Sequence, residues 1–260
     1  MNAMRKMLAA GALVCGLSPG VSHAEGWIVT VGARLSASPP YEGAGHDIFV
    51  PTPTFSLRHA NSLYRFNPPD DGSSLALVHN RYIDFGPVAR FRYARGNSGE
   101  LAGLSRIGWS AEPGAFVNLW PTNWLRGRVE ARRGVFGYGG WVGDAGADLI
   151  YTGPKWEASV GPRIGYGDVG YMGAYFGVTP TEAARSSLFT SVYRPAAGQR
   201  YTGAEAALAY HLVGGLKVVG DIGYHRLSKI PADSPIVRLA GSKDQYSGGI
   251  GLMYSFGVGH

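Results

Sequence analysis

The sequence of 260 residues contains a single cysteine, Cys15, and no apolar run of the length that a membrane-spanning helix needs. Such a helix takes about 20 predominantly apolar residues, so a helical membrane protein is excluded. None of the seven histidines falls in an HExxH motif, and the chain downstream of residue 24 has no GxSxG turn. We therefore expect no metal site and no cofactor, and no familiar catalytic motif marks the chain as an enzyme.

The first 24 residues have the features of a cleavable secretory signal peptide. Arg5 and Lys6 precede an apolar run of 11 residues at positions 7–17, and Ser22-His23-Ala24 supplies a small-x-small ending. The pattern predicts cleavage after Ala24, export, and one mature domain at residues 25–260. A single membrane anchor is the alternative, but the apolar run is too short for it. Because Cys15 lies in the predicted signal, the mature chain would have no thiol for a disulfide or a nucleophile.

The charge balance of the mature chain is mild. It keeps 22 of the 24 Lys and Arg residues, since two belong to the signal, against 18 Asp and Glu. No basic tract is present, and an exported chain of this kind is not expected to bind nucleic acid. With 40 Gly, 16 Pro and 31 aromatic residues, two classes remain: a periplasmic β protein and an outer-membrane barrel.

The stretch LRGRVEAR, at residues 125–132, places a charge at every second position. A helix would scatter these charges around its circumference, whereas a strand puts them all on one face and the uncharged residues on the other. The stretch therefore predicts a strand. In a soluble sandwich the charged face would meet water, and in a membrane barrel it would meet the lumen while Val129 met lipid.

The same alternation recurs along the mature chain in runs of about ten residues, separated by Gly, Pro, Asn and Asp. This is the length of a tilted strand that crosses a bilayer. The runs lie at residues 27–36, 144–151, 155–166, 203–212, 215–226 and 245–256. The region 49–79 alternates least clearly, because Pro51 and Pro53 interrupt it.

Two further features favour the membrane over a soluble sandwich. Aromatic residues end many apolar faces, where they would meet the lipid headgroups: Trp27, Tyr93, Trp109, Trp124, Tyr151, Trp156, Tyr166, Tyr246 and Tyr254. The last run ends at the aromatic Phe256, like the final strand of outer-membrane barrels. Four residues follow it, and Val258 keeps the alternation, so the strand is expected to run on.

These observations predict an all-β fold: a closed antiparallel transmembrane β-barrel of about 12 strands in the bacterial outer membrane, with both termini in the periplasm. An even strand count is typical of such barrels. Long loops are expected at residues 179–200 and 227–244, facing outward. The charged and polar positions of the alternating runs are expected to line the lumen: Arg126, Arg128, Glu130, Arg132, Asp144, Asp148, Glu157, Arg163, Glu205, His211, Lys217, Asp221 and His225.

Several segments resemble the MltA-interacting protein family, also called MipA/OmpV. The similarity lies in residues 161–187, which contain GPR and YFGV, and in residues 224–242, which contain ADSP, together with residues 39–55, 112–116 and 254–256 in the same order. The resemblance implies an outer-membrane β-barrel. It also implies a scaffold, not itself an enzyme, that binds a peptidoglycan lytic transglycosylase and a murein synthase. It assigns no binding residues.

Two other functions stay open at this stage. One is a narrow channel for small polar solutes, lined by the charged faces. The other is a hydrolase of lipids or esters in the outer membrane that uses Ser234, His225 and Asp221. The segment GYGDVG at residues 165–170 matches the GxGxxG pattern, but we expect it to form a turn that opens no helix and therefore binds no phosphate. Outer-membrane lipid and lipopolysaccharide are expected partners of the barrel surface.

Overall fold

A computed structural model of the chain describes residues 26–259. Strands make up most of it, and one sheet contains all twelve of those described. Ten strands are long and two, β3 and β4, have two residues each. Their bounds are β1 Trp27–Ser38, β2 Ile48–His59, β3 Ser73–Ser74, β4 Val78–His79, β5 Ile83–Arg92, β6 Ser110–Thr122, β7 Leu125–Phe136, β8 Gly140–Thr152, β9 Trp156–Gly167, β10 Gly198–His211, β11 Leu216–Leu227 and β12 Asp244–Val258.

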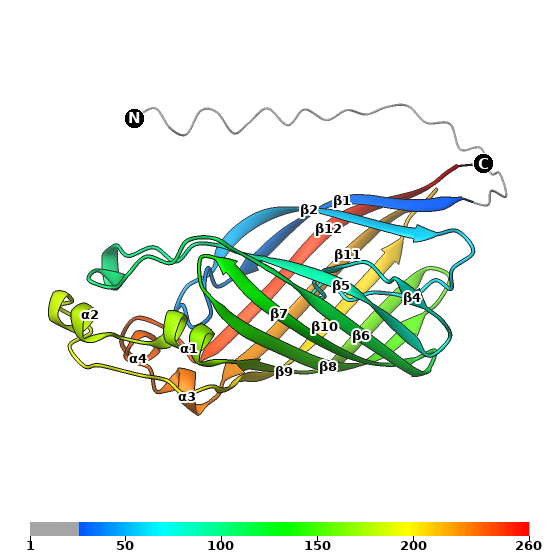
Figure 1. Cartoon of the computed structure of the whole chain (residues 1–260). Helices are drawn as coiled ribbons and strands as arrows, with labels where there is room; N and C mark the ends of the chain where they lie inside the picture. The colour runs from blue at the N-terminus through cyan, green and yellow to red at the C-terminus, as the bar shows by residue number, and fades with distance from the viewer. Residues whose placement is uncertain (1–25, 260) are drawn as a thin grey trace.

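The sheet curls into a barrel in which every pair of neighbouring strands is antiparallel (Figure 1). The first strand lies beside the last, with Trp27 opposite Val258 in the register of β1 and β12. The predicted all-β barrel is therefore confirmed, and β12 runs on past Phe256 to Val258 as expected. The hydrogen-bonded order runs from β2 through β1 and β12 to β5 and β3. Within the described residues β2 and β5 do not pair, so closure is incomplete at this one seam.

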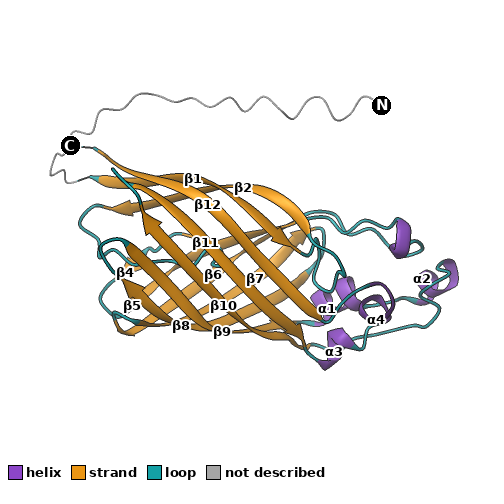
Figure 2. Cartoon of the chain, turned by 180° about the vertical axis from the view of Figure 1, so that it is seen from behind, coloured by secondary structure: helices purple, strands orange, loops and turns teal. Residues whose placement is uncertain are grey.

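The two ends of the barrel differ. The end where β1 begins and β12 ends carries the short connections between β6 and β7, β8 and β9, and β10 and β11, and we call it the terminal end. The opposite end, the helical end, carries the longer loops with their short helices (Figure 2). These are η1 Gly99–Leu101, α1 Val169–Phe176, α2 Pro180–Arg185, α3 Lys229–Ala232 and α4 Pro235–Ala240.

None of the helices in residues 26–259 is long and apolar enough to cross a membrane. The two long loops were predicted as residues 179–200 and 227–244. The first loop begins earlier than predicted, because β9 ends at Gly167, and it ends close to the predicted position, because β10 begins at Gly198. Both loops contain helices, which the strand-based sequence analysis did not anticipate.

The wall separates apolar from charged side chains as the alternation predicts. On β7, Val129 is 57% exposed on the outer face, whereas Arg128 and Glu130 on either side of it are buried inside. Eight of the nine aromatic residues predicted at the strand ends are exposed, and only Tyr254 is half-buried. The predicted signal peptide and its cleavage after Ala24 lie outside the described residues and stay predictions.

Candidate functional site

The interior of the barrel is the candidate functional site, and β7 provides its most charged wall. Arg126, Arg128, Glu130 and Arg132 are all buried there, because a strand directs alternate side chains to the same face. Buried arginines need carboxylate partners, since an unpaired buried charge is strongly destabilising.

The partners of the β7 arginines come mainly from neighbouring strands. Arg126 Nη2 lies 2.6 Å from Asp148 Oδ2 of β8, and the other oxygen of Asp148 lies 2.7 Å from Arg163 Nη2 of β9. One buried carboxylate thus joins three strands. Arg132 pairs with Asp144 of β8 and with Glu130 on its own strand.

The remaining sequence-predicted interior residues form separate pairs elsewhere on the inner face. Glu157 is buried and lies 3.3 Å from both Lys217 and His211. His225 Nε2 lies 3.0 Å from Glu205 Oε1. Asp221 pairs with Arg34 of β1, and Gly249 makes room for this guanidinium, because a Cβ at Gly249 would lie 2.6 Å from Arg34 Nη2. Each of the thirteen predicted residues therefore lies close to a charged residue or a histidine inside the barrel, but they form several pairs instead of one continuous line.

The connection between β2 and β5 folds back into the barrel from the terminal end, and we call residues 65–79 the inserted segment. Asp71 Oδ2 lies 2.5 Å from Arg126 Nη1, and Asp70 Oδ2 lies 2.7 Å from Arg163 Nε. The Gly72 N–H donates to Glu130 Oε1 over 3.2 Å. Residues 70–72 of the inserted segment therefore occupy part of the interior and neutralise part of the arginine wall, whereas residues 73–79 are exposed and pair with β5.

Phe66 and Asp84 hold the base of the inserted segment. Phe66 is 2% exposed and belongs to the terminal-end cluster, which consists of Phe66, Trp120, Ile150, Ala207, Ala209 and Val219. Arg65 lies with its guanidinium 4.4 Å from the ring centroid of Trp120 and pairs with Asp84 over 2.9 Å. Asp84 also accepts a hydrogen bond from Trp120 Nε1 over 2.8 Å. Sequence analysis missed these residues, and the one available signal was the failure of residues 49–79 to alternate.

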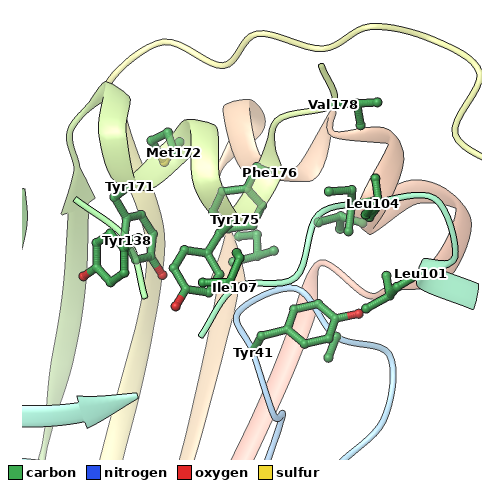
Figure 3. Packing of buried hydrophobic residues seen from close by; sticks show 14 of the residues in the cluster. Tyr41, Leu101, Leu104, Ile107, Tyr138, Tyr171, Met172, Tyr175, Phe176 and Val178 are labelled. Atoms are coloured by element: carbon green, nitrogen blue, oxygen red, sulfur yellow. The ribbon is translucent and has the colours of Figure 1, made fainter. Parts of the chain in front are cut away.

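Loops and helices at the helical end form a second apolar core, the cap cluster (Figure 3). Its centre is α1, in which Tyr171, Met172, Tyr175 and Phe176 are fully buried. Its other members are Tyr41, Ala44, Leu101, Leu104, Ile107, Tyr138, Val142, Val178, Phe189, Leu227, Ile236 and Val237. Because these residues come from all the long loops, the cap cluster closes the helical end of the barrel.

Hydrogen bonds attach the cap cluster to the barrel and to its loops. Tyr171 Oη donates to Glu42 Oε2 over 2.5 Å, and Arg200 Nη1 of β10 donates to the same oxygen over 2.5 Å. Arg95 is buried and donates to the Tyr175 carbonyl over 2.9 Å. Burial raises the pKa of Tyr175 to about 12 and also raises that of Tyr171, so both phenols stay neutral.

The GYGDVG segment does open a helix, and the expectation of a plain turn was wrong. β9 ends at Gly167 and α1 begins at Val169, with Asp168 as its N-cap. The Asp168 side chain accepts from the Tyr171 N–H over 2.8 Å. A carboxylate therefore occupies the helix start, where a phosphate would otherwise bind.

Glu182 stabilises the outer part of the cap through α2. Its carboxylate accepts from the backbone N–H groups of Thr179 and Ser105, over 2.8 and 2.7 Å, and completes a capping box with the Thr179 hydroxyl. Burial alone would raise the pKa of Glu182, but these hydrogen bonds outweigh it and hold the pKa at about 2. Glu182 thus links two loops that are about 75 residues apart in the sequence.

The three residues considered for hydrolysis each have other partners. Ser234 is fully buried, and its Oγ donates to the Phe176 carbonyl over 2.6 Å. His225 pairs with Glu205, and Asp221 pairs with Arg34. Ser234 lies at the start of α4, where its Oγ also accepts from the Ile236 N–H, so it has the role of a helix cap. Within residues 26–259, no group of three or more His, Cys, Asp or Glu side chains is arranged to hold a metal ion.

A cavity of about 560 Å³ lies in the half of the barrel towards the helical end. Its walls include Arg128 and Arg132 of β7, Asp144 of β8, and Asp70 of the inserted segment. Residues 69–73 of the inserted segment and Leu227 of the cap cluster also line it, so the cavity is a chamber with charged walls.

The comparison with protein families decides which family this barrel represents. The profile of the family described as MltA-interacting protein MipA matches residues 31–256, which is nearly the whole of the described chain. The chain belongs to the MipA family. It is an outer-membrane β-barrel of this family, as the resemblance implied. No curated protein matches the chain.

Solved structures with similar folds are outer-membrane barrels. One is an outer membrane channel from Pseudomonas putida F1, with 12% identity, a TM-score of 0.48, and coverage of 93% of this chain and 100% of that one. Another is the NanC porin, with 12% identity, a TM-score of 0.39, and coverage of 88% and 98%. The channel DcaP of Acinetobacter baumannii has 9% identity, a TM-score of 0.38, and coverage of 89% and 96%. MipA-family membership, not these distant similarities, guides the proposal below.

Proposed function

We propose that this MipA-family barrel is a non-enzymatic scaffold that holds a peptidoglycan lytic transglycosylase and a murein synthase at the outer membrane. The observation that carries the proposal is the partly filled interior. The inserted segment enters from the terminal end and the cap cluster lies at the helical end, and ion pairs and apolar contacts hold both in place. A barrel obstructed in this way is expected to act through its outer surfaces. Its apolar wall contacts outer-membrane lipid, and its helical end contacts lipopolysaccharide.

The docking surface proposed for the two enzymes is at the terminal end, which faces the periplasm in this orientation. The turn between β10 and β11 presents Val213, which is 78% exposed, beside the exposed Leu212. Gly214 and Gly215 both have positive φ, which such a tight turn requires. The connection between β2 and β5 lies close to this turn, because Tyr64 Oη is 3.2 Å from Lys217 Nζ of β11. It adds the exposed Leu63 to the same end of the barrel. These exposed apolar side chains lie on neighbouring turns of the terminal end.

Affinity capture tests this proposal. The mature protein, solubilised in mild detergent from its own membrane, is captured and its partners are identified by mass spectrometry. We expect a lytic transglycosylase and a murein synthase to co-purify with the wild-type protein. Val213→Asp is expected to reduce their recovery about tenfold, because a charge in an apolar contact is unfavourable.

Val192→Asp is the matched control, because Val192 is an exposed valine in a loop of the helical end. It should leave recovery unchanged. Recovery of neither enzyme with the wild-type protein, or equal loss with both variants, would contradict the proposal.

A second candidate function, passage of small polar solutes, is favoured by the charged chamber. The thirteen interior residues predicted from the sequence would then line the path. This function requires the inserted segment to leave the interior. Planar-bilayer recording tests it: steady conductance of the wild-type protein would favour the channel, and its absence would favour the scaffold.

A further inference from the structure

The seam between β2 and β5 is the one place where the described wall lacks a strand pairing. β5 pairs with β6 on one side, and on the other side only with the end of the inserted segment. Ser73 lies opposite Ala89 there, and the Leu75 N–H donates to the Pro87 carbonyl over 3.1 Å. The last residues of β5, from Arg90 to Arg92, have no described strand beside them on the seam side.

Prolines show that this seam is not built to close by backbone pairing. Pro113 of β6 and Pro162 of β9 each interrupt the pairing on one side of their strand, where the missing N–H would have donated. Pro51 and Pro53 of β2, in contrast, lie within 12 uninterrupted pairs with β1. Their missing donors therefore fall on the edge that faces the seam.

Pro87 has the same arrangement on β5. Its pairing with Ala115 of β6 is uninterrupted, and its carbonyl points to the seam side, where it accepts from Leu75. The β2 edge thus lacks donors at two positions, and the seam side of β5 from Asp84 to Ala89 is already paired with residues 73–79, so direct pairing of β2 with β5 is disfavoured. The same lack disfavours the addition of a strand from a second copy of the chain.

The charged chamber reaches this seam. Val50 and Thr52 of β2 line it on one side, and Arg90, Phe91 and Arg92 of β5 line it on the other. Residues 69–73 of the inserted segment line the chamber on the side of the terminal end, and Leu227 of the cap cluster also lines it. The unpaired seam leads from the chamber to the lipid-facing surface.

On the chamber side the seam presents two arginines of β5, and on the outer side it presents aromatic rings. Arg90 and Arg92 are each bound to a carboxylate through Nε alone, to Glu130 over 3.1 Å and to Glu112 over 2.6 Å. Within residues 26–259 their Nη atoms donate no hydrogen bond to protein, and the Arg90 side chain is 33% exposed. The β2 segment contains no acidic residue. Guanidinium groups with free Nη atoms bind carboxylates and phosphates.

The outer rim of the seam is apolar. Phe49 and Phe55 of β2 are 75% and 70% exposed, and Phe91 of β5 stacks on Trp109 with ring centroids 5.7 Å apart. The volume of about 560 Å³ is in the range of sites that hold a single small ligand.

We propose that the β2–β5 seam is a lateral portal through which a single-chain amphiphile with an anionic headgroup enters from the bilayer. Its head binds the Nη atoms of Arg90 and Arg92, and its acyl chain lies in the seam between Phe49 and Phe91. A fatty acid and a lysophospholipid share this chemistry. The proposal is independent of the docking of murein enzymes, which uses the opposite end of the barrel.

Photo-crosslinking tests the portal. The mature protein is reconstituted in phosphatidylcholine nanodiscs and illuminated with palmitate that carries a diazirine near the end of its chain. We expect labelled peptides from residues 48–59 and 83–93. Unlabelled palmitate or palmitoyl lysophosphatidate should compete, and the stronger competitor identifies the headgroup. Hexadecanol and hexadecyltrimethylammonium should compete poorly, since neither carries a negative charge.

Variants locate the site. Arg90→Gln with Arg92→Gln should reduce labelling about tenfold through loss of charge-assisted hydrogen bonds. Thr52→Trp should reduce labelling by filling the seam while the arginines stay in place. Arg106→Gln, in an exposed loop of the helical end, is the control and should label normally. Folding of each variant is checked by its heat-modifiable mobility in SDS gels.

Equal competition by hexadecanol would show ordinary lipid contact and overturn the portal. Normal labelling of folded Thr52→Trp would also overturn it. If the double arginine variant does not fold, the headgroup comparison and Thr52→Trp still decide.

Discussion

Arg126 of β7 and Asp71 of the inserted segment form an ion pair, with Nη1 and Oδ2 2.5 Å apart across 55 residues of sequence. The same guanidinium also binds Asp148 of β8. The arginine is therefore shared between the wall of the barrel and the segment that fills it. The attachment of the inserted segment can therefore be tested by itself, because removal of the Asp71 carboxylate leaves the pair between Arg126 and Asp148 in the wall intact.

The first prediction concerns release of the inserted segment. Asp70→Asn with Asp71→Asn should weaken its attachment, because Arg126 and Arg163 each lose one carboxylate and keep Asp148. We expect the free energy of unfolding to fall by about 3 kcal/mol. We also expect bilayer conductance to appear or rise, since the segment would no longer stay in the interior.

Asp47→Asn is the control for this double variant, because Asp47 is an exposed loop carboxylate. It should change neither quantity. Unchanged conductance and stability in the double variant would mean that the two ion pairs do not hold the segment.

The second prediction concerns the apolar anchor of the same segment. Phe66→Ala should destabilise the barrel by about 3–5 kcal/mol, because it leaves a cavity against Trp120 and Ile150. Leu77→Ala, in the same segment but 70% exposed, should change stability by less than about 0.5 kcal/mol. Urea titration followed by tryptophan fluorescence measures both. If Phe66→Ala lowers the stability as little as Leu77→Ala does, Phe66 does not contribute to the core.

The third prediction uses the pH dependence of the cap. The pKa of Glu182 is held at about 2, below its ordinary value of 4.5, so its ionised form stabilises the folded state. This stabilisation is complete above pH 4.5 and is lost as the pH falls towards 2. Tryptic cleavage of the native protein at the exposed Arg185 reports on α2 at neutral pH, and a pepsin digest of the same loop reports on it at low pH.

Glu182→Gln should increase cleavage at Arg185 at neutral pH, since it removes the charge that the N–H groups of Thr179 and Ser105 bind. It should also flatten the rise in pepsin cleavage between pH 4.5 and 2. The neighbouring Thr181→Ala is the control and should behave as wild type. If Glu182→Gln is as resistant as wild type, Glu182 does not hold the cap.

The wall of this barrel could be predicted from the sequence and its contents could not, for a physical reason. Alternation is local, so LRGRVEAR alone indicates that Arg126 and Val129 lie on opposite faces of a strand. Closure and filling depend on contacts between distant residues. The pairs of Asp70 and Asp71 with β9 and β7, and the burial of α1 in the cap cluster, have no local signature. The prolines at residues 51 and 53 were noted as interruptions, and their meaning appears only when β2 is seen at an unpaired edge.

The fourth prediction compares two neighbours on β7. Val129→Arg should cost about 2–4 kcal/mol near the bilayer midplane and impair assembly. Arg128→Gln should still assemble, because Glu130 keeps Arg132 and Arg90 as partners. Heat-modifiable mobility in SDS gels measures assembly. Equal assembly of the two variants would contradict the assignment of faces.

The most direct test of a lipid-facing wall around a filled, charged interior is cysteine labelling at these same two positions, in a mature chain without other thiols. The account predicts that Cys at Val129 resists a water-soluble maleimide and that a fluorophore attached there is quenched by a lipid-dissolved spin label. Cys at Arg128 should react slowly from the aqueous side, and its fluorophore should escape the lipid quencher. Protection of Val129 without lipid quenching would indicate a dry protein core on that face and would contradict the account.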